Sequence, residues 1–452
     1  MPRLLPLFLL AALVGPLAAQ DVSVPYTEFT LANGLRVLVH EDHSTPLVTL
    51  NTYYGVGGIH EKPGRTGFAH LFEHVMFEGS TRVEEGDFDR LLLAAGGTSN
   101  ATTGFDWTYY YETVPSNALE LALWLEADRL GGLLDDMHQG KLDGQREVVK
   151  NERRQRYENQ PYGLFLEQMF STLYPAGSPY SWLPIGSMAD LGAASLEDVK
   201  QFFRTYYVPN NATLVIAGDV TPAQVRPLVE KHFGWIPRGA DVPKLDPRIP
   251  PLAGTRHLVR EDKVTLPQVN LAWRTAPLFS DDHWALNALA YLLAEGKNSR
   301  LYRRLVYDER TAQQVSAFQN GQLLSGDFFV RVTARPDGDL GALERAVLEE
   351  VAKLASEGPT AEEVQRVVNG LETEFVLSIS TVEGKAEQLN SYLYYTGRPD
   401  YLVEDLRRVR ALAPADVQRA AQRYLHGRHR VVLSFVPQGK TALAATSQEN
   451  AR

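Results

Sequence analysis

HLFEH, residues 70–74, is the most informative stretch of this chain. It lies in an apolar-rich run, residues 66–78, which follows Pro63 and Gly64 and is closed by Gly79. Proline and glycine at these places are typical of helix ends, so the run predicts a helix of about three turns.

Three chemically active side chains of this stretch share one side of the expected helix. His70 and His74 are four residues apart and lie ~40° apart around a helix axis, while Glu73 lies ~60° to the other side of His70. Two neutral imidazoles on one face can bind a zinc ion, and a carboxylate beside them can act on a water that the ion holds. The order H-x-x-E-H inverts the H-E-x-x-H of the zincins. A solvated or core pair of histidines is the alternative that these five residues leave open.

A third ligand is expected from a later helix, residues 141–157. If Val148 and Val149 mark its inward face, Glu152 falls between them, whereas Glu147 points about 100° away. An inward carboxylate is costly unless it is paired or bound to a cation, so Glu152 is the better ligand candidate. The alternative is a buried ion pair with Arg156.

Composition excludes several other classes of protein. The chain has 452 residues, enough for two to four domains, and 44% hydrophobic residues, enough for large cores. A net charge of −10 argues against nucleic-acid binding. There is no cysteine, which excludes disulfides and thiolate ligands, so any metal must be held by histidine and carboxylate.

The first residues are typical of a secretory signal peptide rather than of a folded element. A short basic start precedes an apolar run, residues 4–14, and small residues near position 19 offer a cleavage site. We therefore expect residues 1–20 to direct secretion across an inner membrane, with the periplasm as destination. An uncleaved anchor is the alternative.

The rest of the chain predicts two similar domains. Strand and helix patterns over residues 24–236 return over residues 256–438, and a proline-rich linker, residues 237–255, separates them. Asp198, Tyr206 and Leu214 have counterparts 218 residues later, which indicates duplicated domains. The expected fold is α+β, two α/β-sandwich domains with mostly antiparallel sheets. The second lacks H-x-x-E-H in its equivalent helix, and residues 439–452 are expected to form a flexible tail.

A small, polar strand is expected at Thr98–Thr103. Such a strand suits the edge of a sheet, where its free amides can pair with an extended peptide. The alternative is an edge strand that pairs with nothing because its polar residues disfavour pairing.

These features together resemble the inverzincin family of pitrilysin, insulin-degrading enzyme and the mitochondrial processing peptidase. The resemblance covers nearly the whole mature chain and rests on GFAHLFEH (67–74), MFEG (76–79), NAT (100–102), the helix of residues 146–154 and YVPNN (207–211) before Gly218 and Asp219. It implies a zinc metalloendopeptidase with one Zn²⁺ per chain, which cleaves short or unfolded peptides inside a clamshell of which this chain is half. The implied roles are zinc ligation by His70, His74 and Glu152, general-base catalysis by Glu73, and substrate pairing along Asn100, Ala101 and Thr102.

The sequence departs from the family pattern in two respects, which involve three positions. Members often have a carboxylate seven residues before the third ligand, and here that residue is Gln145, which can support a ligand only through its amide. Complete members also supply an Arg and a Tyr, seven apart, from the inactive-type domain, and here these positions are Val306 and Gln313.

The missing pair predicts a division of labour between chains. Arg300 and Tyr307 have the spacing but lie six residues too early. We expect this zinc-bearing chain to pair with a homologous partner that carries the Arg/Tyr pair, with a homodimer as the alternative. A non-catalytic assembly or peptide-binding subunit is the rival class.

Overall fold

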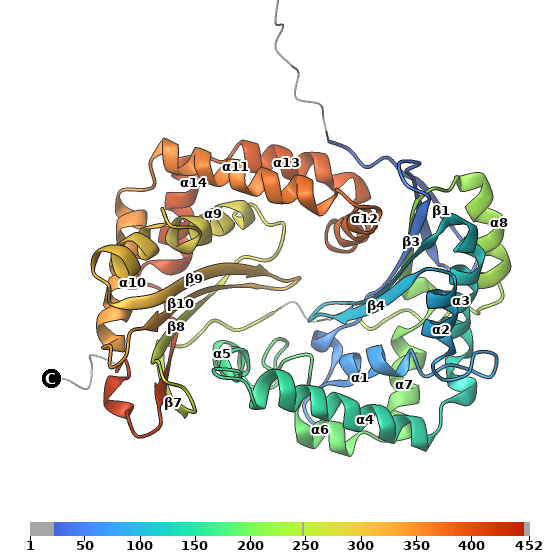
Figure 1. Cartoon of the computed structure of the whole chain (residues 1–452), viewed down its shortest axis with the longest axis horizontal. Coiled ribbons are helices and arrows are strands. Elements are labelled where there is room, and N and C mark those ends of the chain that lie inside the picture. The colour runs from blue at the N-terminus through green and yellow to red at the C-terminus, as the bar shows by residue number, and fades with distance from the viewer. Residues whose placement is uncertain (1–21, 246–247, 447–452) are drawn as a thin grey trace, which may run out of the picture.

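The computed structural model describes residues 22–245 and 248–446 as an α+β protein built around two sheets, which lie at opposite ends of the molecule (Figure 1). The predicted fold class is confirmed. The signal peptide expected at residues 1–20 lies outside the described residues. No helix in the described ranges is long and apolar enough to cross a membrane.

The first sheet has six strands in the order β1-β2-β6-β3-β5-β4, so the polar strand β4 is at its edge as predicted. Its strands are β1 (Thr27–Thr30), β2 (Arg36–Glu41), β3 (Leu47–Tyr54), β4 (Thr98–Thr103), β5 (Thr108–Pro115) and β6 (Ala212–Gly218). The helices of this half are α1 (Phe68–Val75), α2 (Asp87–Ala94), α3 (Leu119–Asp136), α4 (Gln139–Arg153), α5 (Phe165–Leu173), α6 (Met188–Ala193), α7 (Leu196–Tyr206) and α8 (Pro222–Phe233).

The second sheet has five strands in the order β7-β11-β8-β10-β9. Its strands are β7 (Arg256–Asp262), β8 (Gln268–Thr275), β9 (Ala312–Gly321), β10 (Gly326–Ala334) and β11 (Val431–Pro437). The helices are α9 (His283–Ala294), α10 (Leu340–Ser356), α11 (Ala361–Ser378), α12 (Val382–Thr396), α13 (Leu402–Arg410) and α14 (Pro414–Ala420).

The two sheets share one topology. If β1 is set aside, β2 to β6 have the same order, and the same single parallel pair, as β7 to β11. The duplication inferred from the 218-residue offset therefore holds at the level of strand pairing. In this correspondence α9 takes the place of α1. α9 contains no H-x-x-E-H sequence.

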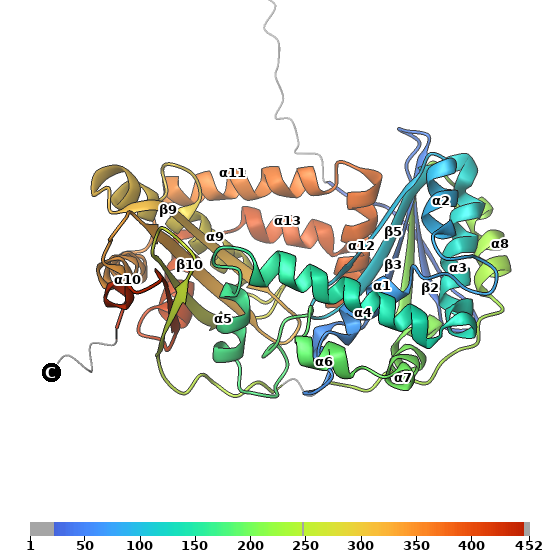
Figure 2. The same ribbon diagram turned by 60° about the horizontal axis from the view of Figure 1, so that its bottom comes forward.

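The halves exchange helices. α5, from the first half, packs on β8 and β11 of the second sheet, and α12, from the second half, packs on β3 and β6 of the first (Figure 2). Phe165 and Phe170 of α5 contact Phe329 of β10, and Asn390 of α12 donates to the side-chain oxygen of Asn51 at 2.7 Å. One hydrophobic cluster accordingly contains residues of both sheets, so the halves form a shared core.

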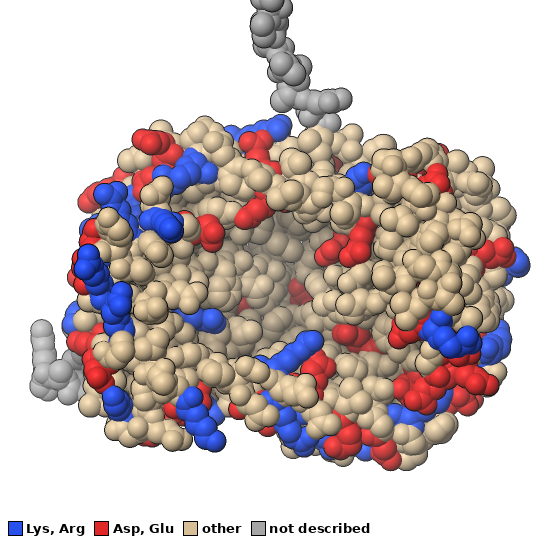
Figure 3. Space-filling view, viewed as in Figure 1, with Lys and Arg blue, Asp and Glu red and all other residues tan. Residues whose placement is uncertain are grey.

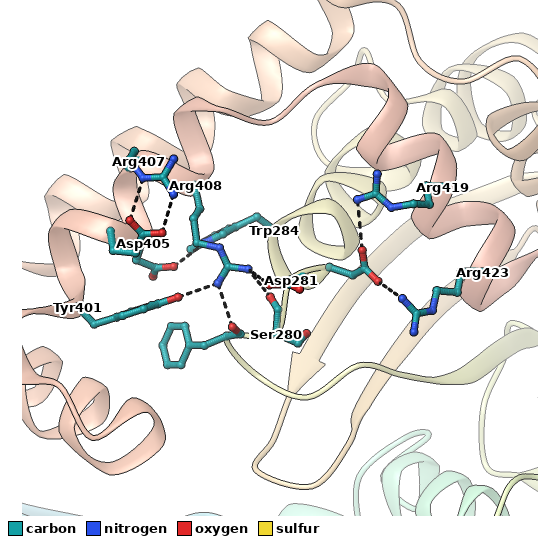
Figure 4. A network of polar contacts seen from close by, with 12 residues as sticks. Ser280, Asp281, Trp284, Tyr401, Asp405, Arg407, Arg408, Arg419 and Arg423 are labelled. Carbon is teal, nitrogen blue, oxygen red and sulfur yellow. Dashed lines mark hydrogen bonds and ion pairs between the residues drawn. The ribbon is translucent and has the colours of Figure 1, made fainter.

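Polar contacts fix α9 in the second half (Figure 4). Arg408 of α13 donates to two backbone carbonyls of the segment that leads into α9, at 2.8 and 2.9 Å. Asp405 accepts a hydrogen bond from the Trp284 indole at 2.6 Å, and Arg423 pairs with Asp282 at 3.0 Å. The helix that corresponds to α1 is thus anchored by ion pairs at its start.

The C-terminal segment departs from the predicted flexible tail. A turn over Thr441–Leu443 follows β11, and the Ala445 amide donates to the Ser434 hydroxyl at 3.0 Å. Ala445 is buried because it packs in the second core. The prediction is wrong for residues 439–446, and residues 447–452 lie outside the described ranges. The expected linker, residues 237–255, has no helix or strand in its described part.

Candidate metal centre

The N-terminus of α1 is capped from outside the helix. Gly67, its N-cap, has φ +88° and no side chain, so the first N–H groups need another acceptor. The buried carboxylate of Glu61 accepts from the amides of Gly67 and Ala69 at 2.9 and 2.8 Å and from the Trp182 indole at 3.0 Å. Burial raises the pKa of Glu61 to about 8, while these donors and the N-terminus of the helix favour its anionic form.

A single loop fixes the position of α1 relative to α4. A Cβ on Gly186 would lie 2.4 Å from the Gly67 Cα, so the backbones touch where α1 begins. The carbonyl of Gly186 accepts a hydrogen bond from the buried Arg153 of α4 at 2.8 Å. Since Arg153 follows Glu152 in the sequence, the loop sets the distance between the two helices that carry the predicted ligands.

The three predicted ligands converge. The Nε2 atoms of His70 and His74 lie 3.6 and 3.2 Å from one carboxylate oxygen of Glu152. Two ligand atoms ~2.1 Å from a tetrahedral zinc ion are ~3.4 Å apart, so the spacing fits one ion. In the described part of the chain, this is the one group of three or more His, Asp or Glu residues that could hold a metal.

The electrostatics of this cluster suit a cation. Burial, with His74 nearby, lowers the pKa of His70 to about 4, so its imidazole is neutral at pH 7 and its lone pair is available. Burial raises the pKa of Glu152, but the His74 hydrogen bond and the charges of His70 and Arg156 outweigh it, and the net shift is downward. Two neutral imidazoles and one carboxylate are a donor set that zinc accepts, so the residues fit the metal.

Glu73 faces the edge strand. With His74, Asn100 and Ala101 it lines a cavity of about 240 Å³ between α1 and β4. Its Oε2 atom is buried without a hydrogen-bond partner among the described residues. Burial raises the pKa of Glu73, and a hydrogen bond with Thr103 opposes that shift. The carboxylate is therefore positioned between the metal cluster and the strand to which a peptide could pair, with a raised proton affinity.

The structure corrects part of the reasoning that selected Glu152. Val148, expected to face inward, is 45% exposed, and only Val149 is buried. Glu152 still faces the cluster because it lies three residues from Val149, ~60° around the helix. The alternative ion pair also exists, since the second oxygen of Glu152 contacts Arg156 at 2.8 Å. Ligand cluster and ion pair therefore coexist on one carboxylate.

The other predicted residues are placed as follows. Gln145 donates its amide to the side chain of Glu78 at 2.5 Å, and no contact with a ligand is seen among the described residues. Asn100 and Thr102 lie opposite Tyr111 and Tyr109 of β5. The buried Ala101 points to the other face, as expected for alternate residues of a strand.

Arg300 and Tyr307, which have the spacing of the expected pair, lie in different surroundings. Arg300 makes an ion pair with Glu363 at 2.8 Å, and Tyr307 is 72% exposed. Val306 is half-buried and Gln313 is exposed on β9. The geometry is consistent with a missing Arg/Tyr pair.

Sequence reasoning missed Glu61, Thr103 and Arg153. The signal for Glu61 was available: an acidic residue six positions before a glycine that starts a helix can supply the missing cap. Thr103 and Arg153 act through contacts distant in sequence, which no local pattern reveals.

The fold and the site define a class: a duplicated α+β protein in which one domain carries two histidines and a glutamate of an H-x-x-E-H zinc peptidase. Residues 36–178 match the family described as Insulinase (Peptidase family M16), and residues 193–371 match the Peptidase M16 inactive domain. The chain belongs to the M16 peptidase family.

Two curated relatives and one solved structure illustrate the similarity. The zinc protease PqqE of Helicobacter pylori is 32% identical over 92% of this chain and 94% of its own length. A probable mitochondrial-processing peptidase subunit beta of Arabidopsis thaliana is 26% identical over 92% of this chain and 79% of its own. The crystal structure of a protease from Helicobacter pylori is 29% identical, with a TM-score of 0.86 over 91% of this chain and 100% of that one.

Proposed function

We propose that this chain is a zinc-dependent endopeptidase that binds one Zn²⁺ through His70, His74 and Glu152. The observation that carries the proposal is the spacing of 3.2 and 3.6 Å between the ligand atoms of two separate helices. The names of the zinc-protease relatives support the same chemistry.

The residues of the chain have separate tasks. Bound zinc would supply a Lewis acid that polarises the scissile carbonyl and acidifies water. Glu73, whose pKa is raised by burial, takes a proton from the attacking water and passes it to the leaving amine. The free edge of β4 holds the peptide extended, so that backbone hydrogen bonds fix the carbonyl beside Glu73.

The substrates are short or unfolded peptides, because an extended strand must lie along β4 inside the molecule. The central hollow between the two halves is open to solvent on one face (Figure 3). We propose secretion to the periplasm on the basis of residues 1–20.

The working enzyme is a two-chain assembly in which a homologous partner completes the clamshell and supplies the Arg/Tyr pair. Val306 and Gln313, at the positions of that pair, support this proposal. Co-purification from the native source tests it. A fully active, self-paired enzyme would favour the homodimer instead.

The catalytic proposal is tested with metal content and cleavage of a quenched-peptide library. Glu73→Gln should keep stoichiometric zinc and lose turnover, whereas Glu152→Gln should lose both. Glu147→Gln is the matched control, because Glu147 is an exposed glutamate of the same helix that pairs only with Lys150 among the described residues. Wild-type activity in Glu73→Gln would exclude Glu73 as the base, and zinc binding without any turnover would favour the non-catalytic subunit.

A further inference from the structure

A second, larger cavity lies beside the metal centre and extends to the second sheet. It has a volume of about 1090 Å³ and is lined by Thr103, Gly104 and Phe105 at the end of β4, by the segment after α4, and by β9 and β10. Two of its residues contact the metal site directly, since Thr103 hydrogen-bonds Glu73 and Arg156 pairs with Glu152. A peptide extended along β4 would run into this cavity beyond Thr103, at ~3.3 Å per residue.

The walls of this cavity are aromatic, and they are held rigidly. Phe165 of α5 packs edge-on against Phe329 of β10, and Phe329 stacks on Phe318 of β9. The turn after β4 is fixed to the second half, since Asp106 accepts a hydrogen bond from the Leu323 amide at 2.9 Å. Both walls therefore belong to the shared core, and the cavity is preformed.

The lining residues include two cations and no carboxylate. Arg156 is already paired with Glu152. Arg331 of β10 is different: its Nε donates to the neutral side-chain oxygen of Asn270 at 3.2 Å, and its guanidinium lies 4.3 Å over the ring of Phe165. Among the described residues no carboxylate pairs with it, and burial alone lowers the pKa of Arg331.

Asn270 itself is fully buried, and its amide donates to the carbonyl of Leu433 at 3.2 Å. Its side-chain oxygen is thereby turned toward Arg331. The protein orients this guanidinium with a neutral acceptor and an aromatic face but leaves its charge uncompensated. A partly buried cation without a counter-ion is costly, and a cavity beside a catalytic centre is where an anionic ligand would compensate it.

We propose that this cavity binds the arm of the substrate that extends past Thr103, and that Arg331 pairs there with a carboxylate of the peptide. Phe165, Phe318 and Phe329 would contact the apolar part of the same arm. The carboxylate comes either from an acidic side chain or from a free C-terminus, because both present the oxygen pair that a guanidinium binds. The inference rests on the proposed peptidase function and assigns the substrate preference of that site.

The test uses the zinc-loaded full chain and quenched peptides in which a Glu is moved along the sequence. Each peptide is compared with its Gln counterpart, and each is made with a free and an amidated C-terminus. For wild type, we expect kcat/KM to be about tenfold higher or more for the peptide with a carboxylate at one particular position, or at the C-terminus, than for its Gln or amidated counterpart. Arg331→Met should abolish that advantage and leave the Gln and amidated peptides within about twofold of wild type. Arg335→Met, at an exposed arginine just after β10, is the matched control and should change neither.

Binding is measured separately, by anisotropy of labelled peptides with the Glu73→Gln variant, with and without Arg331→Met. A wild type that cleaves Glu and Gln peptides equally, and free and amidated peptides equally, would overturn this inference and leave the peptidase proposal intact. An equal loss for all peptides in Arg331→Met would also overturn it, because the role of Arg331 would then be structural. If Arg331→Met does not fold, the inference is tested by the peptide preference of wild type and by that of Arg331→Lys. Absence of any cleavage, with the binding preference retained, would refute the peptidase proposal alone.

Discussion

Removing the Glu61 carboxylate tests whether the metal helix depends on a cap from outside itself. In Glu61→Ala the amides of Gly67 and Ala69 lose their acceptor, whereas the indole of Trp182 still donates to the Gly58 carbonyl at 3.0 Å. The two amides are at the start of α1, four residues or fewer from His70. We therefore expect both the stability of the first half and its zinc affinity to fall.

The magnitude follows from the number of donors left without a partner. A buried donor without an acceptor costs about 1–3 kcal/mol, so two backbone amides at about 1.5 kcal/mol each give about 3 kcal/mol. Because the two halves share a core, the unfolding unit has roughly 420 residues, for which 1 kcal/mol corresponds to about 1 °C. The expected decrease in Tm is about 3 °C, and Glu61→Gln, which keeps one acceptor, should lose about half as much.

Differential scanning calorimetry of the apo and zinc-loaded forms measures the stability, and chelator competition measures the zinc Kd. Glu84→Ala, at an exposed glutamate before α2, should leave both unchanged. If Glu61→Ala unfolds at the wild-type temperature and competes for zinc as wild type does, the carboxylate is not what holds α1.

Three further predictions concern other parts of the molecule. Zinc at about 1,000 times its Kd should stabilise wild type and Glu73→Gln by about 4 kcal/mol, and Glu152→Gln much less. Thermal melts with and without chelator measure this difference. Gly186→Ala places a Cβ 2.4 Å from the Gly67 Cα at a residue with φ +71°, so it should cost more than about 2 kcal/mol and weaken zinc binding. Gly192→Ala is the control, because its Cβ would make only an ordinary contact with Lys150 Nζ at 3.8 Å. Burial raises the pKa of Asp327 to about 7. From about pH 4 to 7 the folded protein therefore holds a proton that the unfolded chain releases. The free energy of unfolding should fall with rising pH over this range, by up to about 1.4 kcal/mol per pH unit. Asp327→Asn should flatten this slope in melts between pH 5 and 8, and an unchanged slope would mean that another group causes it.

Local patterns predicted the elements near the metal site well. The predicted bounds of β4 coincide with the observed ones because Gly97 precedes this strand. The ligand set followed from residue types and helical spacing, because neither depends on distant contacts. The inward face of α4 was harder: this helix has few apolar residues, and Val148 belongs to its exposed side.

What the sequence did not predict depends on contacts between distant segments. Periodicity shows that α5 and α12 have apolar faces but not which sheet each face covers, and both cover the sheet of the other half. Arg153 is an unremarkable charged residue of α4 until the fold places it against Gly186. The same holds for Arg331: only the three-dimensional structure shows that no carboxylate pairs with it in the part of the chain described.

The helix exchange has a practical consequence for anyone who wishes to isolate the catalytic half. A chain cut at the proline-rich linker would lose α12. This would expose to solvent the apolar residues that α12 and its neighbours cover, Leu38, Val215 and Ala217. The excised fragment would carry all the proposed zinc ligands and the proposed base. It would also expose an apolar surface through which it would associate with other molecules. An engineered fragment that stays soluble must therefore retain the second half, because that half covers the apolar surface of the first.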